Sequence, residues 1–484
     1  MNEFQNKRAA VIGLARAGVP AARFLLERGA RVVGFDSKTR EQLSPDVLEL
    51  EREGVELRLG EHGFETIESC DLVVLSPGLK VHFEPLRSVI ERVERVGGEV
   101  IGELELASRF CPCPMIAVTG TKGKSTTVKL ITEMLLACGV DAIAAGNTGT
   151  PLISVLPQLS SDSWAVVEVS SFQLEKAPTF KPKIAVLLSL LEDHQDYHPT
   201  LEQYWGTKIK IFNNQMEEDF AIFNCDDGSV ETVYFLKDPS FADQAGYYPT
   251  EIKAQRWGTS GQNLQEKDIE ELTAYFHQGY LCLADEEETM RIIETLQVPL
   301  QGEHNFGNLS AALAAVFAIL GENIHQHLDK IADAIRNFQT LPHRLEIVAR
   351  KDGVTYVNDS QSTIPDAAIA ALRAFPPPVS LLLGGRAKIG GESYVNLMKT
   401  VKEVKAKVYL FGEAAEMLEQ VADRENVEKT SIHRENTLAE ALQLAKMNAS
   451  SGETVVLSPA CASFDQFSSY EERGETFKRL AREL

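Results

Sequence analysis

The sequence predicts an α/β protein of three domains in series, and three observations support this prediction. Short apolar runs alternate with helical patterns along almost the whole chain, which is typical of parallel, doubly wound sheets. Several of these runs are continuously apolar, as in strands that are buried on both faces. The chain has 484 residues, and about 100–200 residues per domain gives about three domains.

The first domain, residues 1–112, is predicted to be Rossmann-like. A helix between its first two strands is expected to end at Gly29, since glycine commonly follows a helix C-terminus. A proline-rich joint near Pro112 and Pro114 closes the domain. Its expected strands lie in "RAAVIGL", "RVVGFD" and "DLVVLSPG".

A nucleotide-like ligand is predicted at one edge of this first sheet. The stretch "VIGLARAGVP" is similar to a dinucleotide fingerprint, but Ala15 stands where the middle glycine would be. Asp36 ends the next strand, about where a ribose-binding acid would sit. Ser76, Pro77 and Gly78 close the third strand on the same edge. The alternative is a plain packing turn without a ligand.

The second domain, residues 113–340, is predicted to be a P-loop-type ATPase domain with a mainly parallel sheet. Its first strand, "MIAVTG", leads into Gly120 and then into Gly123-Lys124, with two residues enclosed where the usual P-loop has four. Backbone N–H groups at the following helix N-terminus would face a phosphate. Lys124 would reach the β/γ-phosphates, and Ser125 or Thr126 would hold a metal ion. A glycine turn with a capping serine is the alternative.

Further candidates follow other strands of this domain. Glu168 ends a buried strand, where a carboxylate beside a phosphate loop suits Mg²⁺, although it could equally be a solvated loop residue. His194 lies between Asp193 and Asp196, and a second Mg²⁺ position fits this spacing better than a zinc site. Lys208 follows on a helix; its alternative interpretation is a surface lysine. Residues 213–300 are acidic and less regular, with a hairpin expected in "AYFHQGYLCLADEEE" and a long Ala-rich helix after them.

The third domain, residues 341–484, is predicted to be a second Rossmann-like α/β domain. Three polar loops each follow a strand, and together they predict a crevice for small polar ligands at one sheet edge. These loops are "NDSQST", "GGRAKIGG" and "LSPACASFDQF".

Charge and composition exclude several classes of protein. The net charge of −22 argues against a nucleic-acid or membrane-surface binder, because such binding needs clustered Lys and Arg. The seven cysteines are scattered and odd in number, which indicates reduced thiols. We expect no signal peptide in the polar start and no apolar stretch that approaches the ~20 residues of a membrane helix. The sequence therefore indicates a cytoplasmic protein.

Eight motifs, taken in their order along the chain, resemble those of the Mur ligases of peptidoglycan synthesis, most closely the glutamate-adding branch. The resemblance runs from Gly13 to the C-terminus and is weakest across residues 213–300. The motifs are "GTKGKST", "GNTG", "EVSSFQLE", "EDHQDYHP", "GEHNFGN", "LPHRLE", "NDS" and "SPACASFDQF".

The resemblance implies an ATP-dependent amide ligase that adds D-glutamate to UDP-N-acetylmuramoyl-L-alanine through an acyl phosphate and a tetrahedral intermediate. It also implies two Mg²⁺ sites and a carbamylated Lys208, and we expect a monomer. The alternative is a sister ligase that adds L-glutamate or another amino acid to a related acceptor. A dehydrogenase is disfavoured by Ala15, and a non-catalytic sensor of UDP-sugars by the presence of Lys124, Glu168 and His194.

The resemblance also assigns roles to residues. The catalytic set is Lys124, His194 and Lys208. The metal ligands are Ser125, Glu168, His194 and Lys208. The ATP site comprises Gly120, Thr121, Lys122, Gly123, Lys124, Ser125, Thr126, Asn305, Asn308, Arg344 and Asp359. The UDP-substrate site comprises Asp36, Ser37, Ser76, Pro77, Gly78 and Asn147, and the glutamate site Thr363, Lys388, Ser463, Phe464 and Tyr470.

Three features depart from the family pattern. Lys122 stands where the family loop usually has Asn, and Gln361 stands where the glutamate branch commonly has Lys. "GGRAKIGG" is also unlike the commonest form. The last two features touch the amino-acid side of the site, so the preferred glutamate enantiomer stays open.

Overall fold

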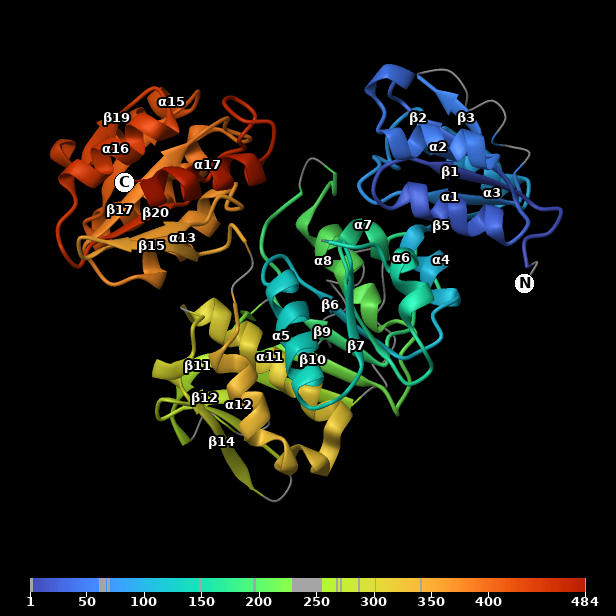
Figure 1. Cartoon of the computed structure of the whole chain (residues 1–484), viewed down its shortest axis with the longest axis horizontal. Helices are drawn as coiled ribbons and strands as arrows, with labels where there is room; N and C mark the ends of the chain where they lie inside the picture. The colour runs from blue at the N-terminus through green and yellow to red at the C-terminus, as the bar shows by residue number, and fades with distance from the viewer. Residues whose placement is uncertain are drawn as a thin grey trace. The chain divides into compact units, whose positions relative to one another are not determined.

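The chain folds into two compact units (Figure 1). The first comprises Met1–Val298 and Phe306–Asn337, and the second comprises Pro299–Asn305 and Phe338–Leu484. The structure is a computed structural model that describes residues 3–60, 67, 70–147, 149–194, 197–228, 255–266, 269, 272–285, 288–300, 302–339 and 342–483.

The N-terminal part of the first unit is a five-stranded parallel sheet in the order β3-β2-β1-β4-β5 (blue in Figure 1). The predicted strands and the helix between the first two are confirmed, and Gly29, with φ of 89°, follows that helix. The strands are β1 (Arg8–Ile12), β2 (Arg31–Asp36), β3 (Glu56–Leu59), β4 (Leu72–Leu75) and β5 (Glu99–Gly102); the helices are α1 (Gly18–Glu27), α2 (Pro45–Glu53), α3 (Leu86–Arg95) and α4 (Glu103–Arg109), with a 3₁₀ turn η1 (Arg40–Gln42).

The rest of the first unit contains a nine-stranded sheet in the order β14-β13-β12-β11-β10-β9-β6-β8-β7. In the order of the sheet, each strand from β7 across to β12 is parallel to its neighbour. Strand β13 is antiparallel to both β12 and β14, and the β12–β13 pair confirms the expected hairpin. The strands are β6 (Met115–Thr119), β7 (Ala142–Gly146), β8 (Trp164–Glu168), β9 (Ile184–Leu187), β10 (Phe220–Asn224), β11 (Gln255–Leu264), β12 (Leu272–His277), β13 (Tyr280–Ala284) and β14 (Thr289–Glu294).

The order of this sheet positions the candidate site. Strand β6 lies between β8 and β9 in the sheet. Strands β8 and β7 lie on one side of β6, and the later strands β9 and β10 lie on the other. The carboxyl ends of these three parallel strands therefore meet where the strand order reverses, a place where α/β sheets bind ligands.

Helices cover this sheet, and α12 packs against α5. They are α5 (Lys124–Ala137), α6 (Leu152–Val155), α7 (Ser171–Leu174), α8 (Leu201–Ile209), α11 (Glu303–Leu320) and α12 (Leu328–Arg336), with 3₁₀ turns η3 (Leu156–Gln158), η4 (Lys210–Phe212), η6 (Thr295–Gln297) and η7 (Gly321–Gln326).

The expectation that no apolar stretch reaches membrane-spanning length needs a correction. The helical segment Glu303–Gln326 has 24 residues and a mean hydropathy of 1.4, so by length and composition it could cross a membrane. Inside the fold, 61% of its most apolar window is buried. The Ala-rich composition lets this helix pack closely against its neighbours, as a core helix does.

The second unit contains a six-stranded sheet in the order β15-β16-β20-β17-β18-β19, with only the β15–β16 pair antiparallel. The strands are β15 (Glu346–Lys351), β16 (Val354–Asn358), β17 (Val379–Gly384), β18 (Lys407–Phe411), β19 (Ile432–Arg434) and β20 (Thr454–Leu457). The helices are α13 (Pro365–Ala374), α14 (Val395–Val404), α15 (Ala415–Arg424), α16 (Leu438–Asn448) and α17 (Tyr470–Glu483), with 3₁₀ turns η8 (Gly391–Tyr394) and η9 (Lys429–Ser431).

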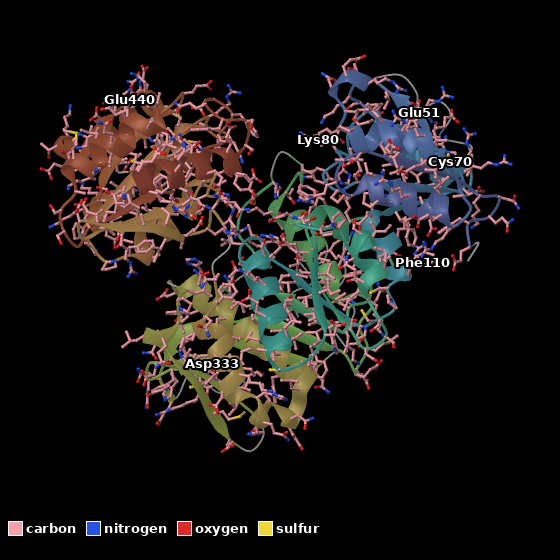
Figure 2. All side chains as sticks on the ribbon, in the orientation of Figure 1. Glu51, Cys70, Lys80, Phe110, Asp333 and Glu440 are labelled. Carbon is pink, nitrogen blue, oxygen red and sulfur yellow. The ribbon has the colours of Figure 1, made fainter. Side chains whose placement is uncertain are left out.

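The four inner strands of this sheet, β16, β20, β17 and β18, each contribute to two cores. Leu381 and Leu383 of β17 join one buried cluster, whereas Leu382 between them joins another. This alternation follows from the two-residue period of side chains along a strand. Charged side chains such as Glu440 lie on the outer surface of the helices that cover the cores (Figure 2).

Candidate functional site

The predicted phosphate loop connects β6 to α5 and is built on two glycines with positive φ. Gly120 has φ of 144°, and Gly123, the residue before the helix, has φ of 86°. A Cβ at Gly123 would lie 2.0 Å from Asn308 Oδ1 of α11. The loop is further fixed by a hydrogen bond of 2.7 Å from Thr121 N to Ser189 O, beyond the end of β9. The short loop is therefore a packed turn that brings Asn308 beside the helix N-terminus.

Two lysine side chains converge on one backbone oxygen of this loop. Lys124 Nζ donates to Gly120 O at 2.9 Å and to Thr121 O at 3.0 Å, and Lys208 Nζ donates to Gly120 O at 2.9 Å. Lys208 is only 2% exposed. Burial lowers the pKa of Lys208 well below its usual value, and the neighbouring Lys124 charge lowers it further. Lys208 is therefore a buried residue of the site, which excludes its interpretation as a surface lysine.

A buried carboxylate lies beside the first turn of α5. Glu168, at the end of β8, is 2% exposed. Its Oε2 accepts a hydrogen bond of 2.6 Å from Ser125 Oγ, and its Oε1 accepts one of 3.2 Å from Asn147 Nδ2. A carboxylate, a hydroxyl and an amide thus lie together, and oxygen atoms of this kind are the ligands that Mg²⁺ prefers. The alternative of a solvated loop glutamate is wrong.

His194 lies in the segment after β9, with φ of 55°. Its ring packs edge-on against Phe172, with ring centroids 4.8 Å apart. Lys122 Nζ lies 3.7 Å from Asp193 Oδ2. Burial would raise the pKa of Asp193, but the charges of Lys122, His194 and Lys124 and a hydrogen bond from His194 N together lower that pKa overall. Asp196 lies outside the described residues, and among the described residues no group of three or more His, Cys, Asp or Glu could hold a metal ion.

Tyr204 belongs to this group of residues, although the sequence analysis did not identify it. The side chain is 1% exposed, its Oη donates to Thr121 Oγ1 at 3.4 Å, and its ring centroid lies 4.6 Å from Lys208 Nζ. The available signal was spacing: Tyr204 precedes Lys208 by four residues on α8, so both side chains share one helix face.

The predicted nucleotide residues of the first sheet meet at the carboxyl ends of its strands. Asp36 Oδ2 accepts a hydrogen bond of 2.8 Å from Leu14 N, and Ser76 Oγ donates to Gly13 O at 2.5 Å. A Cβ on Gly18 would lie 1.9 Å from Gly13 O. These two glycines therefore enforce a tight turn, and Asp36 supports it; Ser37 is exposed beside it.

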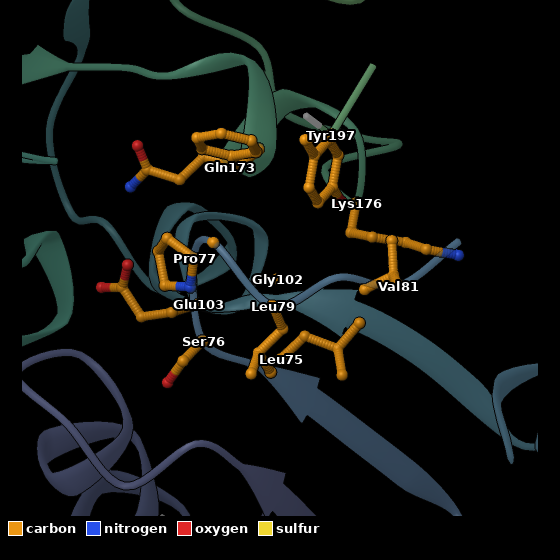
Figure 3. A pocket seen from close by; sticks show the side chains of 12 residues that line it. Leu75, Ser76, Pro77, Leu79, Val81, Gly102, Glu103, Gln173, Lys176 and Tyr197 are labelled. Carbon is orange, nitrogen blue, oxygen red and sulfur yellow. The ribbon is translucent and has the colours of Figure 1, made fainter. Parts of the chain in front are cut away.

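A pocket lies between this edge and residues after β8 and β9, all within the first unit (Figure 3). Ser76, Pro77 and Gly78 line it together with Gln173 and Tyr197, which the sequence analysis did not identify. A second link is a hydrogen bond of 2.5 Å from Arg16 Nη2 to Asn147 O. The predicted UDP-site residues Asn147 and Ser76 thus belong to parts of the chain that contact each other.

In the second unit, the predicted residues follow β16, β17 and β20. Lys388 Nζ donates to Thr363 Oγ1 at 3.0 Å. Gln361 accepts a hydrogen bond of 2.5 Å from Arg344 Nε and lies 3.4 Å from Tyr470 Oη. Ser463 is 2% exposed and Phe464 is 62% exposed.

Asp359 is the buried acid of this unit. Its Oδ2 accepts hydrogen bonds from Ser362 Oγ and, at 2.7 Å, from Ser458 Oγ. Burial raises the pKa of Asp359 to about 6, against these hydrogen bonds. Asn305 is also buried and belongs to this unit, whereas the Gly120–Thr126 loop and Asn308 belong to the first.

Comparison with protein families gives matches along most of the chain. Residues 7–102 match the Mur ligase MurD-like N-terminal domain, residues 118–316 the Mur ligase middle domain, and residues 343–461 the Mur ligase glutamate ligase domain. The chain is 38% identical to UDP-N-acetylmuramoylalanine--D-glutamate ligase of Pelotomaculum thermopropionicum, with 100% of this chain and 99% of the relative covered. It is also 38% identical to the ligase of the same name from Koribacter versatilis, with 100% and 98% covered.

Solved structures share the fold. A pseudomurein peptide ligase type C from Methanothermus fervidus matches with a TM-score of 0.56 and 18% identity, with 99% of this chain and 100% of that chain covered. MurF from Acinetobacter baumannii matches with a TM-score of 0.58 and 15% identity, with 87% and 92% covered. These likenesses confirm the predicted α/β fold class.

Proposed function

Because this chain belongs to the Mur ligase family, we propose that it is an ATP-dependent ligase that adds D-glutamate to UDP-N-acetylmuramoyl-L-alanine. The proposal places it in the bacterial cytoplasm, as a monomer, in the synthesis of peptidoglycan precursors. Its domains would divide at residues 1–112, 113–340 and 341–484.

The chemistry begins with a carboxylate, which is a poor electrophile because its leaving group would be oxide. Transfer of the γ-phosphoryl group from ATP to the alanine carboxylate gives an acyl phosphate and ADP. The amino group of glutamate then attacks the carbonyl carbon, and a tetrahedral intermediate expels phosphate as the amide bond forms. Catalysis of such a reaction depends on positioning the reactants and on offsetting the charge of anions brought together.

The phosphate loop supplies the first set of contacts. The N–H groups of Gly120–Thr126 and the Lys124 ammonium would hold the phosphates of ATP. Ser125 and Glu168 would hold a first Mg²⁺, and their 2.6 Å contact supports a shared ligand position. His194 and Lys208 would serve a second. Bound Mg²⁺ supplies positive charge that neutralises the phosphoryl oxygens.

An ammonium group repels Mg²⁺. Lys208 can therefore bind the second Mg²⁺ only when its amino group has been converted into an anionic group. A buried amine with a lowered pKa can add to CO₂ through its nitrogen lone pair, forming an N–C bond and releasing one proton. The resulting carbamate is an anion with two ligand oxygens. We therefore propose that Lys208 is carbamylated in the working enzyme.

The remaining predicted residues would bind the three substrates. Asp36, Ser37, Ser76, Pro77, Gly78 and Asn147 would contact the nucleotide sugar. Asn305, Asn308, Arg344 and Asp359 would contact ATP. Thr363, Lys388, Ser463, Phe464 and Tyr470 would contact glutamate.

The observation that carries the proposal is the convergence of Lys124, Lys208, Ser125 and Glu168 on one phosphate loop. The test is ADP release by the purified protein, which should require both UDP-N-acetylmuramoyl-L-alanine and glutamate. Lys124→Ala should lower this rate at least about 100-fold, and Lys129→Ala, on the same helix, should leave it unchanged. A rate of ADP release that does not depend on one of the two substrates would refute the proposal.

A sister activity remains the second candidate, because Gln361 contacts both Arg344 and Tyr470 in the amino-acid part of the site. Such an enzyme would add L-glutamate or another amino acid. Product analysis with D- and L-glutamate in competition separates the two candidates, since only one diastereomer should accumulate.

A further inference from the structure

Arg473 on α17 is a fully buried cation whose hydrogen-bond acceptors are all neutral. Its exposed fraction is 0%. Nε donates to Ser360 Oγ at 3.0 Å, Nη2 to Ser360 O at 2.8 Å, and Nη1 to Cys461 O at 3.1 Å. Among the described residues, no carboxylate forms an ion pair with it. Its position therefore needs an explanation, since a buried charge without an ionic partner is costly.

The acceptors of Arg473 belong to the loops that contain the proposed glutamate residues. Ser360 lies in the loop after β16, which leads to Thr363, and Cys461 lies in the loop after β20, which leads to Ser463. A Cβ on Gly385, in the loop after β17, would lie 3.1 Å from Arg473 Nη1.

These three loops also bond to one another. Ala460 N donates to Ser362 O at 3.0 Å, and Arg386 N donates to Ala462 O at 2.8 Å. Ser360 Oγ, itself an acceptor from Arg473, donates to Tyr470 O at 2.8 Å. One guanidinium group thus donates hydrogen bonds to two of the loops, lies beside Gly385 of the third and, through Ser360, is linked to the start of its own helix.

We propose that Arg473 is a specificity-determining positioning residue, whose buried positive charge beneath these three loops favours an incoming amino acid that carries a side-chain carboxylate. The inference rests on the proposed function, because it concerns the amino-acid part of that site. Arg473 acts through the loops and through its electric field, and it need not touch the substrate.

The charge persists at neutral pH and is not offset by its acceptors. Burial lowers the pKa of Arg473 to about 10, which still leaves it protonated. The Asp465 carboxylate raises that pKa from a distance, and its Oδ2 accepts a hydrogen bond of 3.2 Å from Glu413 N. In a low-dielectric interior an uncompensated charge acts over a longer range than in water. A neutral side chain such as that of glutamine interacts with this charge only through its dipole, whereas a second carboxylate interacts with it through a full negative charge.

The test compares two variants. Arg473→Gln is neutral but can still donate hydrogen bonds, whereas Arg473→Lys keeps the charge but loses the planar guanidinium group with its several N–H donors. The readout is the ratio of the inhibition constant of glutamine to the KM of glutamate. We expect this ratio to fall about tenfold or more in Arg473→Gln and to stay within about threefold in Arg473→Lys. Arg479→Met, an exposed arginine of the same helix, is the matched control.

The outcomes separate the inference from the function on which it rests. If the wild-type enzyme does not consume glutamate with ATP, the proposed function fails. If it does, and the ratio of the inhibition constant of glutamine to the KM of glutamate is the same in Arg473→Gln as in the wild type, the inference is overturned. The KM of the nucleotide sugar should stay within about twofold in both variants. Should Arg473→Gln not fold, a loss of discrimination in Arg473→Lys, which keeps the charge, overturns the inference.

Discussion

At the scale of single residues, contacts with other segments arrange the polar groups of the phosphate loop, and only some of these contacts were predictable from the sequence. Lys124, Ser125 and Glu168 were predictable, because each follows a buried strand in a recognisable pattern. Tyr204 was not, because an aromatic residue at helical spacing is far more often part of a core. Its contacts to Thr121 and to Lys208 emerge only when α8 packs beside the loop.

Lys208 gives the prediction that belongs to this scale. Lys208→Ala should lower the ligation rate at least about 100-fold, because the metal ligand proposed above would be lost, and a small added carboxylate such as formate should restore part of it. Lys210→Ala, two residues along, serves as the control. The measurement is the initial rate of ADP release at fixed Mg²⁺ with and without formate. Full activity of Lys208→Ala without formate would contradict the carbamate proposal.

At the scale of elements, helix α5 depends on the glycine that precedes it. Gly123 and Gly139, at opposite ends of α5, have φ of 86° and 84°, but only at Gly123 would a Cβ meet another residue. The two positions therefore separate backbone strain from steric conflict.

Gly123→Ala should abolish tight nucleotide binding, because Asn308 must move as well as the backbone. Gly139→Ala should lower the free energy of unfolding by only about 1 kcal/mol and leave nucleotide affinity unchanged. Calorimetric titration with ADP and thermal melting measure the two effects. Equal affinities in the two variants would show that Asn308 adapts freely.

Helix α4 contributes a buried acid that the proposed reaction does not use. Glu103 is 1% exposed, and its Oε1 accepts a hydrogen bond of 3.0 Å from Ile153 N. Burial raises the pKa of Glu103 from 4.5 to about 7. The folded chain therefore keeps this proton at pH values where the unfolded chain has lost it.

The stability that comes from this neutral carboxyl is fully present below pH 4.5 and is lost as the pH rises through about 7. Glu103→Gln, which mimics the neutral acid, should match the wild type at pH 4.5 and exceed its unfolding free energy at pH 8 by up to about 3 kcal/mol. Chemical unfolding of both proteins at the two pH values tests this, with the exposed Glu94→Gln as control. A constant difference across pH would contradict it.

At the scale of the whole molecule, the division into two compact units predicts stepwise unfolding. All three tryptophans, Trp164, Trp205 and Trp257, belong to the first unit. Tryptophan fluorescence should therefore follow one unfolding step and far-ultraviolet circular dichroism should follow two. ADP with Mg²⁺ should raise the midpoint of the fluorescence step, because Lys124, Ser125 and Glu168 lie in that unit. Coincident single transitions would show that the units unfold together.

The fold was largely predictable because its central strands are continuously apolar, as in Leu72–Leu75 and Ile184–Leu187. Strands at sheet edges, such as β3, β15 and β19, were not predicted. An edge strand is covered on fewer sides, so its pattern is mixed: β3 alternates between exposed and half-buried residues. Contacts between distant segments, such as that of Arg16 with Asn147, leave no local pattern at all.

The carbonyl oxygen of Gly120, which accepts hydrogen bonds from both Lys124 and Lys208, has a consequence for turnover. If Lys124 holds the phosphates of ATP as proposed, its ammonium would exchange a phosphate oxygen for this carbonyl oxygen when the nucleotide leaves, and would keep a hydrogen-bond acceptor throughout the cycle.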